Sequence, residues 1–192
     1  FLIWTLFSYG ETPIIESGIL PKPGKVFSAY GELCSENSLI RELCLSLGFN
    51  FGGYIKALLV SLPVAFIIGL FPVFKATFQM QIDAYRFIPL TAVTSIFIAS
   101  FGIGTPLKIN FLAFGIMIYL IPIIIQRINE VKDVYLKTVY TIGATSWQTI
   151  RTVYIPSVLS KLSDDIRVLT AISWTYIIVA EGIGDQGGLG SL

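Results

Sequence analysis

The composition predicts an all-α, polytopic membrane protein. Apolar residues make up 54% of the 192 residues and charged residues only 13%. The mean hydropathy of +0.77 exceeds what a soluble domain of this length needs for its core. Several stretches with few charges are long enough to cross a bilayer as helices. The chain begins inside an apolar run, without a basic segment before it, so we expect one transmembrane domain that starts partway through a span.

The N-terminal part predicts the end of a first span and then a long linker. Residues 1–7 are the apolar tail of that span, and residues 8–48 follow as a linker rich in proline and glycine. The X-Pro restrictions of residues 20–26 favour extended chain before a helix. Residues 25–33 carry apolar side chains on one side, which predicts either a helix lying on the membrane surface or a packed connector.

The longest apolar pattern covers residues 38–71 and predicts a helix interrupted at Gly52 and Gly53. Its second part, residues 51–71, is long enough to span a bilayer. Lys56 within it should snorkel or face protein. Pro63 is expected to kink it.

The next segments predict a turn, an interfacial helix and a second full span. Residues 72–75 form the turn. Residues 76–87 are too polar for the lipid core, and they place Asp83 and Arg86 one helical turn apart. Residues 87–107 contain no charge before Lys108 and are therefore predicted as one span.

The last two predicted spans flank a polar segment. Residues 109–126 form the first. Residues 168–180 are uncharged but too short to cross alone, so their helix must begin near Pro156, with Glu181 marking its far end. Residues 182–192 form a turn into a following segment.

Residues 135–156 predict two short helices joined by a bend. Gly143 can adopt the left-handed conformation that ends a helix. Thr145 and Gln148 have the spacing of a reciprocal capping box at the start of the second helix. Pro156 can end that helix and begin the next, because its ring fixes φ and it has no N–H.

The second short helix has an apolar face that points to a binding partner. Trp147, Ile150 and Tyr154 recur at helical spacing, with Val153 beside Ile150. A stripe of this kind fits the groove of a partner protein. A hairpin packed on its own domain would explain the glycine and the stripe, but it would not explain the apolar spans on both sides.

The distribution of basic residues predicts the topology. If residues 128–156 are cytoplasmic and residues 8–48 extracytoplasmic, the positive-inside rule is satisfied. The inner segments then hold Lys75, Arg86, Arg127, Lys132, Lys137, Arg151, Lys161 and Arg167, and the outer segments hold Lys22, Lys25, Arg41 and Lys108.

The order of these landmarks resembles the permeases of binding-protein-dependent ABC importers. Gly143, nine residues, Val153, Ile155 and Pro156 are similar to the second half of the family's EAA loop, while Lys137, Thr138 and Val139 stand where the family has Glu-Ala-Ala. Further landmarks are similar to the branch that carries nitrate, sulfonate, taurine and bicarbonate: LPKPGKV at residue 20, GLFPVFK at 69, RFIP at 86, FGIG at 101, and Trp174 and Ala180-Glu181 before GGLG.

The resemblance implies a type I ABC importer permease fold of usually six spans, with the first truncated here and the last missing. It implies transport of a small anion by alternating access at a permease dimer, usually of identical copies, in the bacterial inner membrane. Two ATP-binding subunits and an extracytoplasmic solute-binding protein would complete the assembly. The expected ATPase-coupling residues are Lys137, Thr138, Val139, Gly143, Ala144, Trp147, Ile150, Arg151, Tyr154 and Pro156.

Part of the solute path is expected after Pro89, where Thr91, Thr94 and Ser95 make a polar stripe in an uncharged helix. An equally good interpretation is that these hydroxyls bond their own backbone or pack between helices.

The main alternative function is a secondary transporter or channel not coupled to ATP. Against it, the spans lack an acidic pair or ring, although Lys56 and Glu181 lie within or beside them. An intramembrane enzyme has less support, because no catalytic or metal-binding arrangement recurs in a span and the sequence contains no His and no Walker lysine motif. We therefore expect no catalytic residues, cofactor, metal or nucleic-acid partner. Cys34 and Cys44 are expected to be unpaired thiols, and a disulfide between them is the alternative if both face an oxidising compartment.

Overall fold

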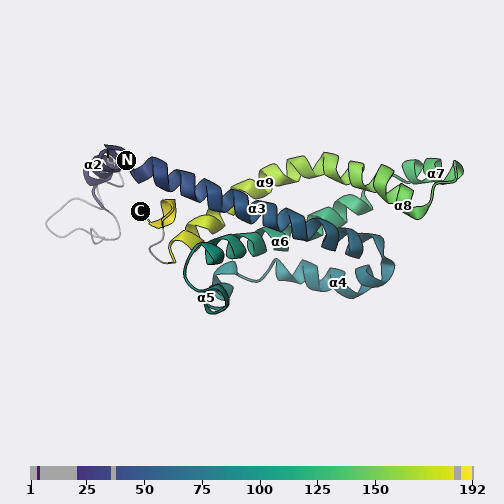
Figure 1. Ribbon diagram of the computed structural model, residues 1–192, viewed down its shortest axis with the longest axis horizontal. Coiled ribbons are helices and arrows are strands. Elements are labelled where there is room, and N and C mark those ends of the chain that lie inside the picture. The colour runs from purple at the N-terminus through teal and green to yellow at the C-terminus, as the bar shows by residue number, and fades with distance from the viewer. Residues whose placement is uncertain (1–3, 5–20, 36–37, 184–186, 192) are drawn as a thin grey trace. The chain divides into compact units, whose positions relative to one another are not determined.

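The computed structural model describes residue 4 and residues 21–35, 38–183 and 187–191 (Figure 1). The regular elements within these ranges are all helical, which confirms the predicted fold class. The chain divides into two units, Phe1–Leu45 and Ser46–Leu192. The predicted first span at residues 1–7, apart from Trp4, and the linker up to residue 20 lie outside the described residues.

The helix predicted over residues 25–33 is α2 (Pro23–Ser35). Pro23 begins it, at a position where a missing N–H breaks no intrahelical bond. Phe27 and Tyr30 are 68% and 62% exposed, which favours a surface helix over a packed connector.

The interruption predicted at Gly52 and Gly53 is wrong, because α3 (Ser38–Leu70) is one continuous helix. A Cβ on Gly53 would come within 2.8 Å of the Leu112 side chain on a neighbouring helix. Small residues allow helix backbones to approach closely in membranes. This glycine therefore serves packing.

Two other residues of α3 were singled out from the sequence. Lys56 donates a hydrogen bond to Asn110 Oδ1, so its ammonium group faces protein as predicted. The backbone remains helical on both sides of Pro63.

The turn predicted at residues 72–75 is wrong, because these residues form the first turn of α4 (Pro72–Tyr85). Phe71 is extended and Pro72 lies in the first turn, where its restricted φ suits a helix start. Asp83 and Arg86 form the expected ion pair, with 2.7 Å between Oδ1 and Nη2.

The single span predicted over residues 87–107 is also wrong. The chain turns between α4 and Pro89, continues as the 3₁₀ turn η1 (Leu90–Val93) and α5 (Thr94–Phe101), and leaves α5 at Gly102 with φ +68°. The two helical parts on either side of this break are bent by 97°. Pro89 favours an extended conformation for the residue before it, and Gly102 can adopt its positive φ because it has no Cβ. The backbone therefore breaks at both positions, although the apolar pattern continues through them.

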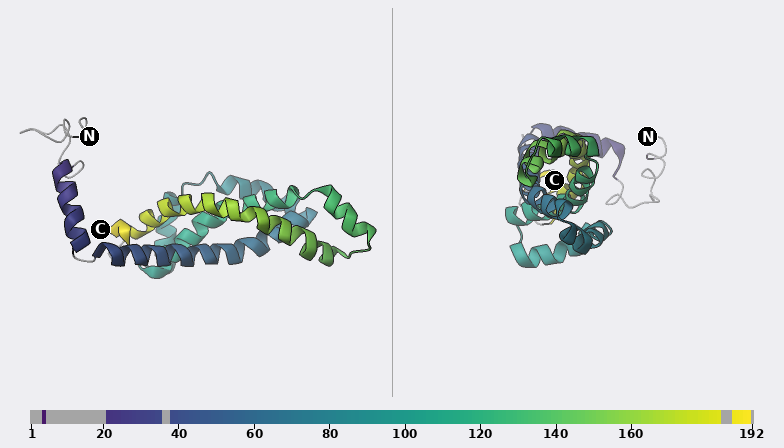
Figure 2. Two further views of the ribbon diagram at one scale, coloured as in Figure 1. Left: turned by 90° about the horizontal axis from the view of Figure 1, so that it is seen from above. Right: turned by 90° about the vertical axis from the view of Figure 1, so that its right-hand side faces the viewer.

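The core of the second unit lies where α6 (Thr105–Asn129) packs against α9 (Ile155–Glu181). Figure 2 shows both running along α3. A Cβ on Gly115 would lie 2.7 Å from Leu90 and 3.0 Å from Tyr176, so this glycine permits close packing of three segments. The fully buried apolar residues of the two helices include Leu107, Phe111, Leu112, Leu120, Ile124, Val158 and Ile177.

In the described part of the chain, two helices are long and apolar enough to cross a membrane: residues Leu39–Leu70 and Thr105–Asn129. The bent pair Pro72–Tyr85 and Leu90–Phe101 can be counted as a third span. α9 is continuous, as predicted. It carries four charged residues in its first half, Lys161, Asp164, Asp165 and Arg167, and one at its end, Glu181.

Candidate functional site

The first helix of the predicted loop is α7 (Asp133–Thr141), and Gly143 directly follows its C-cap residue Ile142, where the sequence placed the helix end. Gly143 has φ +82°. Its N–H donates to Tyr140 O at 3.0 Å, and the N–H of Ala144 donates to Val139 O at 3.0 Å. This pair of bonds is the Schellman motif, which satisfies the last carbonyl groups of a helix. It sets the direction in which the chain leaves α7.

The second helix begins with the predicted capping box. Thr145 Oγ1 accepts from the Gln148 N–H at 3.4 Å, and Gln148 Oε1 accepts from the Thr145 N–H at 2.8 Å. Such a cap typically contributes about 1 kcal/mol. Together with the Schellman motif it determines the bend between α7 and α8 (Ser146–Thr149) from both sides.

The prediction that Pro156 ends the second helix is wrong. α8 continues through a π-helical turn, η2 (Ile150–Tyr154), directly into α9, and Tyr154 keeps right-handed helical angles. Proline lacks an N–H and its ring clashes with the carbonyl four residues earlier. A wider turn before Pro156 is one way in which a helix accommodates such a residue.

Only part of the predicted apolar stripe is exposed. Trp147 is 67% exposed, whereas Ile150 and Tyr154 are half-buried and Val153 is buried. The π-turn changes the angular spacing of these side chains, so regular helical spacing did not place them correctly. Burial raises the pKa of Tyr154, and the neighbouring Tyr140 and Asp133 add to the effect.

Sequence reasoning missed four large apolar side chains that the structure exposes on the same helical hairpin as Trp147. Their exposed fractions range from 51% to 79%. The sequence feature that could have revealed them is their place near the ends of short polar helices, where an apolar side chain has no hydrophobic core to pack into. We define the hairpin surface as Trp147 with Val134, Tyr135, Tyr140 and Ile142.

The other predicted coupling residues lie in the same part of the chain, from α7 to the start of α9. Lys137, Thr138, Arg151 and Pro156 are exposed, and Val139 and Ala144 are half-buried. Thr138 Oγ1 donates to the Val134 carbonyl at 2.8 Å, so its hydroxyl already has a backbone partner.

The base of the hairpin is held by a charge network that the sequence did not reveal. The Arg127 guanidinium forms two bonds to the Asp165 carboxylate, Nε to Oδ2 at 2.8 Å and Nη2 to Oδ1 at 2.7 Å. Glu130 Oε2 accepts from Arg127 Nη1 at 2.8 Å and from Lys161 Nζ at 3.0 Å. These bonds, from Arg127 first, lower the pKa of Glu130 to about 2. The network joins the end of α6 to the first half of α9.

The predicted polar stripe lies at the break between α4 and α5. Thr91 belongs to η1, and Thr94 and Ser95 form the first turn of α5. Thr91 and Ser95 are exposed and Thr94 is half-buried. No group of three or more potential metal-ligating side chains converges among the described residues.

These features define a multi-pass helical membrane protein with an exposed helical hairpin at one end. The chain belongs to the family described as binding-protein-dependent transport system inner membrane component, whose model matches residues 57–192. It is therefore an ABC importer permease. This family works with ATPase and substrate-binding protein partners.

Three relatives illustrate the match. The taurine transport system permease protein TauC of Escherichia coli is 26% identical over 97% of this chain and 69% of its own length. The putative aliphatic sulfonates transport permease protein SsuC of Bacillus subtilis is 26% identical over 98% of this chain and 67% of its own length. A putative ABC transporter permease of Methanocaldococcus jannaschii is 25% identical over all of this chain and 72% of its own length.

Proposed function

We propose that this permease imports a small anion, such as a sulfonate, taurine, nitrate or bicarbonate, by alternating access at a dimer of identical copies. The names of the relatives, which are permeases for taurine and for aliphatic sulfonates, support the first two solutes. Two ATP-binding subunits and one solute-binding protein complete the proposed assembly in the bacterial inner membrane.

The hairpin surface is the proposed contact with the ATPase. The observation that carries this proposal is the hairpin itself, in which a Schellman motif and a capping box hold a bend while Trp147 and Ile142 remain 67% and 79% exposed. Exposed aromatic and aliphatic side chains on a rigid support are typical anchors of a protein interface. ATP hydrolysis is then assigned to the partner.

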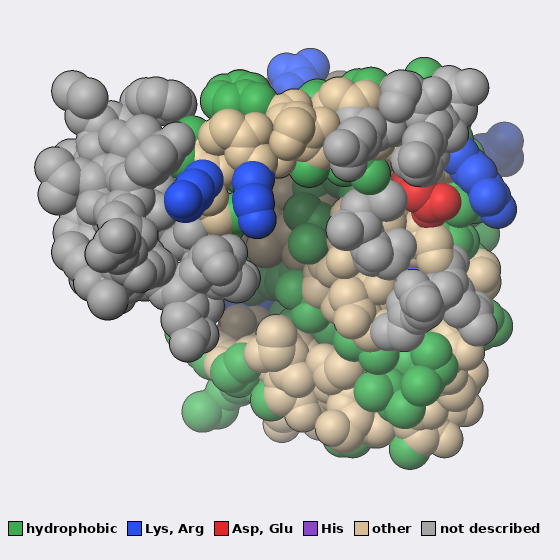
Figure 3. Space-filling view, turned by 90° about the vertical axis from the view of Figure 1, so that its left-hand side faces the viewer, with side chains coloured by type: hydrophobic (Ala, Val, Ile, Leu, Met, Phe, Trp, Pro, Cys, Tyr) green, Lys and Arg blue, Asp and Glu red, His purple; other side chains and the backbone are tan. Residues whose placement is uncertain are grey.

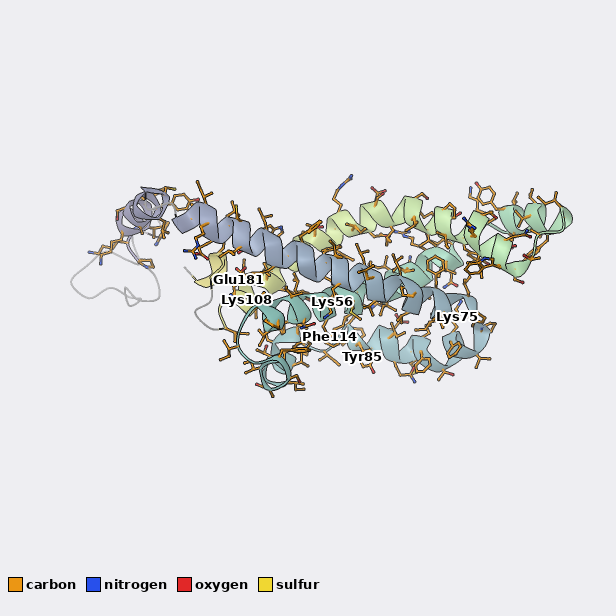
Figure 4. All side chains as sticks on the ribbon, viewed as in Figure 1. Lys56, Lys75, Tyr85, Lys108, Phe114 and Glu181 are labelled. Carbon is orange, nitrogen blue, oxygen red and sulfur yellow. The ribbon has the colours of Figure 1, made fainter. Side chains whose placement is uncertain are left out.

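The proposed topology places the hairpin in the cytoplasm and residues 8–48 outside. Segments on opposite sides of the membrane are separated by an odd number of spans. The count is odd when the bent pair is taken as one span together with α3 and α6. In Figure 4, Lys75 lies toward the hairpin end, and Lys108 and Glu181 lie toward the other. The excess of basic residues in the segments assigned to the inside supports this orientation.

Thr91, Thr94 and Ser95 are proposed to line part of the solute path. Irregular backbone at membrane depth is tolerated where it is buried in protein or lines a water-filled cavity. Discontinuous helices form binding sites in other transporters for the same reason. The break before α5, with the exposed residues Thr91 and Ser95 beside it, supports this placement.

Reconstitution tests the proposed function. The permease is placed in proteoliposomes with its ATPase and solute-binding protein, and uptake of labelled taurine, alkanesulfonate, nitrate and bicarbonate is measured. ATP-dependent uptake of one of them is expected. Uptake that needs only an ion gradient and no ATPase would show a secondary transporter instead.

A further inference from the structure

Two charged side chains are completely buried at the end of the second unit opposite the hairpin. Lys108 lies in the first turn of α6 and Glu181 is the last residue of α9, and both are 0% exposed. Figure 4 shows them at this end. Charged residues inside helical membrane proteins are costly and commonly have a functional reason. Neither belongs to the hairpin or to the polar stripe.

Glu181 holds the segment that follows α9. Its Oε2 accepts a hydrogen bond from the Gly190 N–H at 3.0 Å. Gly188, with φ +108°, approaches so closely that a Cβ there would lie 2.3 Å from Glu181 Cδ. Only a residue without a side chain fits this position. We call residues 187–191 the glycine turn.

Two other helices hold the same turn. Ser46 Oγ on α3 accepts from the Leu189 N–H at 2.8 Å. Lys108 Nζ on α6 donates to the Gly187 carbonyl and lies 5.2 Å from the centre of the Phe49 ring, within the range of a cation–π contact. The glycine turn therefore connects α3, α6 and α9.

One oxygen of this arrangement is left unsatisfied. Glu181 Oε1 is buried and has no hydrogen-bond partner among the described residues. A buried oxygen without a partner raises the free energy of the state that buries it, and contact with water would recover that loss. Figure 3 views this end, and red carboxylate atoms cover only a small part of its described surface. Burial of this oxygen therefore raises the free energy of the state in which the turn is closed.

We propose that Glu181 is a positioning residue of a latch at the extracytoplasmic end of the permease. In the state described here it holds the glycine turn across α3, α6 and α9, and it releases the turn when this end opens to the outside. The unsatisfied oxygen favours release because opening hydrates it. This proposal rests on the proposed topology and on alternating access.

Accessibility of the turn tests the latch directly. Leu189→Cys is introduced together with Cys34→Ser and Cys44→Ser, because the two native thiols are exposed. The variant is assembled with its ATPase and solute-binding protein, and labelling by a membrane-impermeant maleimide is followed with and without ATP and vanadate. We expect the labelling rate to change severalfold between the two conditions. Equal rates would overturn the latch.

Two substitutions of Glu181 test whether its hydrogen bond or only the volume of its side chain holds the glycine turn. Glu181→Ala should increase labelling in the resting state severalfold and raise ATPase activity in the absence of solute. Glu181→Gln should stay near the parent in both, since its amide oxygen can still accept from Gly190. In the Glu181→Ala variant, the KM for solute should change little while the maximal transport rate falls. If Gln and Ala behave alike, the hydrogen bond does not hold the turn.

Two glycine substitutions supply a matched comparison. A Cβ at Gly188 meets only Glu181 side-chain atoms beyond Cβ, whereas a Cβ at Gly190 meets the Ile178 carbonyl oxygen at 2.7 Å. Gly188→Ala should therefore lose part of its effect on labelling once Glu181→Ala is present, the remainder being the strain of a Cβ at φ +108°, and Gly190→Ala should retain its full effect in that background. Purely additive effects at Gly188 would contradict the proposed contact.

The two proposals can fail separately. If ATP-dependent transport is present but Leu189→Cys labels equally in both conditions, the latch is wrong and the importer function stands. If uptake proceeds without ATPase, the importer function is wrong, and the glutamate and glycine comparisons still report whether Glu181 holds the turn.

Discussion

Gly143 determines the bend of the hairpin through its backbone angle alone. Nothing lies within 4 Å of a Cβ placed on it, so a side chain would meet no clash. Its φ of +82° is nevertheless costly for other residues, by about 1–2 kcal/mol and more for β-branched ones. Gly143→Val should therefore lower transport and transport-stimulated ATPase activity in proteoliposomes without loss of membrane insertion.

Asparagine supplies the control for this prediction. It adopts left-handed angles more readily than other residues with a Cβ. Gly143→Asn should accordingly retain most of the activity that Gly143→Val loses. Equal activity of both variants and the parent would show that the angle of the bend does not matter for coupling.

Trp147 is the most exposed aromatic residue of the second short helix, and its indole is the proposed anchor on the ATPase. Aromatic anchors at interfaces commonly contribute on the order of 2 kcal/mol. Trp147→Ala should weaken pull-down of the ATPase about 30-fold while insertion persists. Val153→Ala is a useful comparison, because Val153 is 8% exposed and should affect stability more than binding. Undiminished pull-down by the Trp147 variant would remove this residue from the interface.

At the scale of elements, the charge network joins α6 and α9 at the base of the hairpin. Arg127 and Asp165 have side chains only 26% and 13% exposed, and the geometry is bidentate. Arg127→Gln should cost on the order of 2 kcal/mol, since it leaves the Asp165 carboxylate poorly satisfied. Thermal unfolding in detergent measures this, with Arg167→Gln as control, because the Arg167 ion pair with Asp164 is largely exposed. A similar loss in both variants would contradict a special role for the network.

The lowered pKa of Glu130 adds a pH dependence to the same network. A carboxylate whose pKa falls from 4.5 to about 2 on folding stabilises the native state above pH 4.5, and this contribution is lost as the pH falls toward 2. The melting temperature of the parent should therefore drop more steeply across this window than that of Glu130→Gln. Parallel curves for the two proteins would show that Glu130 does not contribute.

At the scale of the whole molecule, the native cysteines provide an internal standard for topology. Cys34 and Cys44 lie in the segment proposed to be outside, and both are exposed. In intact cells an impermeant reagent should label them, and it should label Ser146→Cys in a background lacking both only after the membrane is permeabilised. Labelling at position 146 from outside would reverse the proposed orientation.

The sequence alone determined the membrane class, the continuous helix after Pro156 and the caps on both sides of the hairpin's bend. These follow from composition and from contacts between residues three or four positions apart, such as Thr145 with Gln148 and Gly143 with Tyr140. Local chemistry of this kind can be read from spacing.

Only the tertiary structure decided where helices break and which distant residues meet. The apolar pattern ran through residues 87–107, yet the backbone turns between α4 and η1 and again at Gly102. The spacing along the chain does not reveal that Arg127 meets Asp165, or that the turn after α9 joins Ser46 and Lys108. Hydrophobicity along one chain measures affinity for lipid, whereas these contacts depend on how helices distant in sequence pack together.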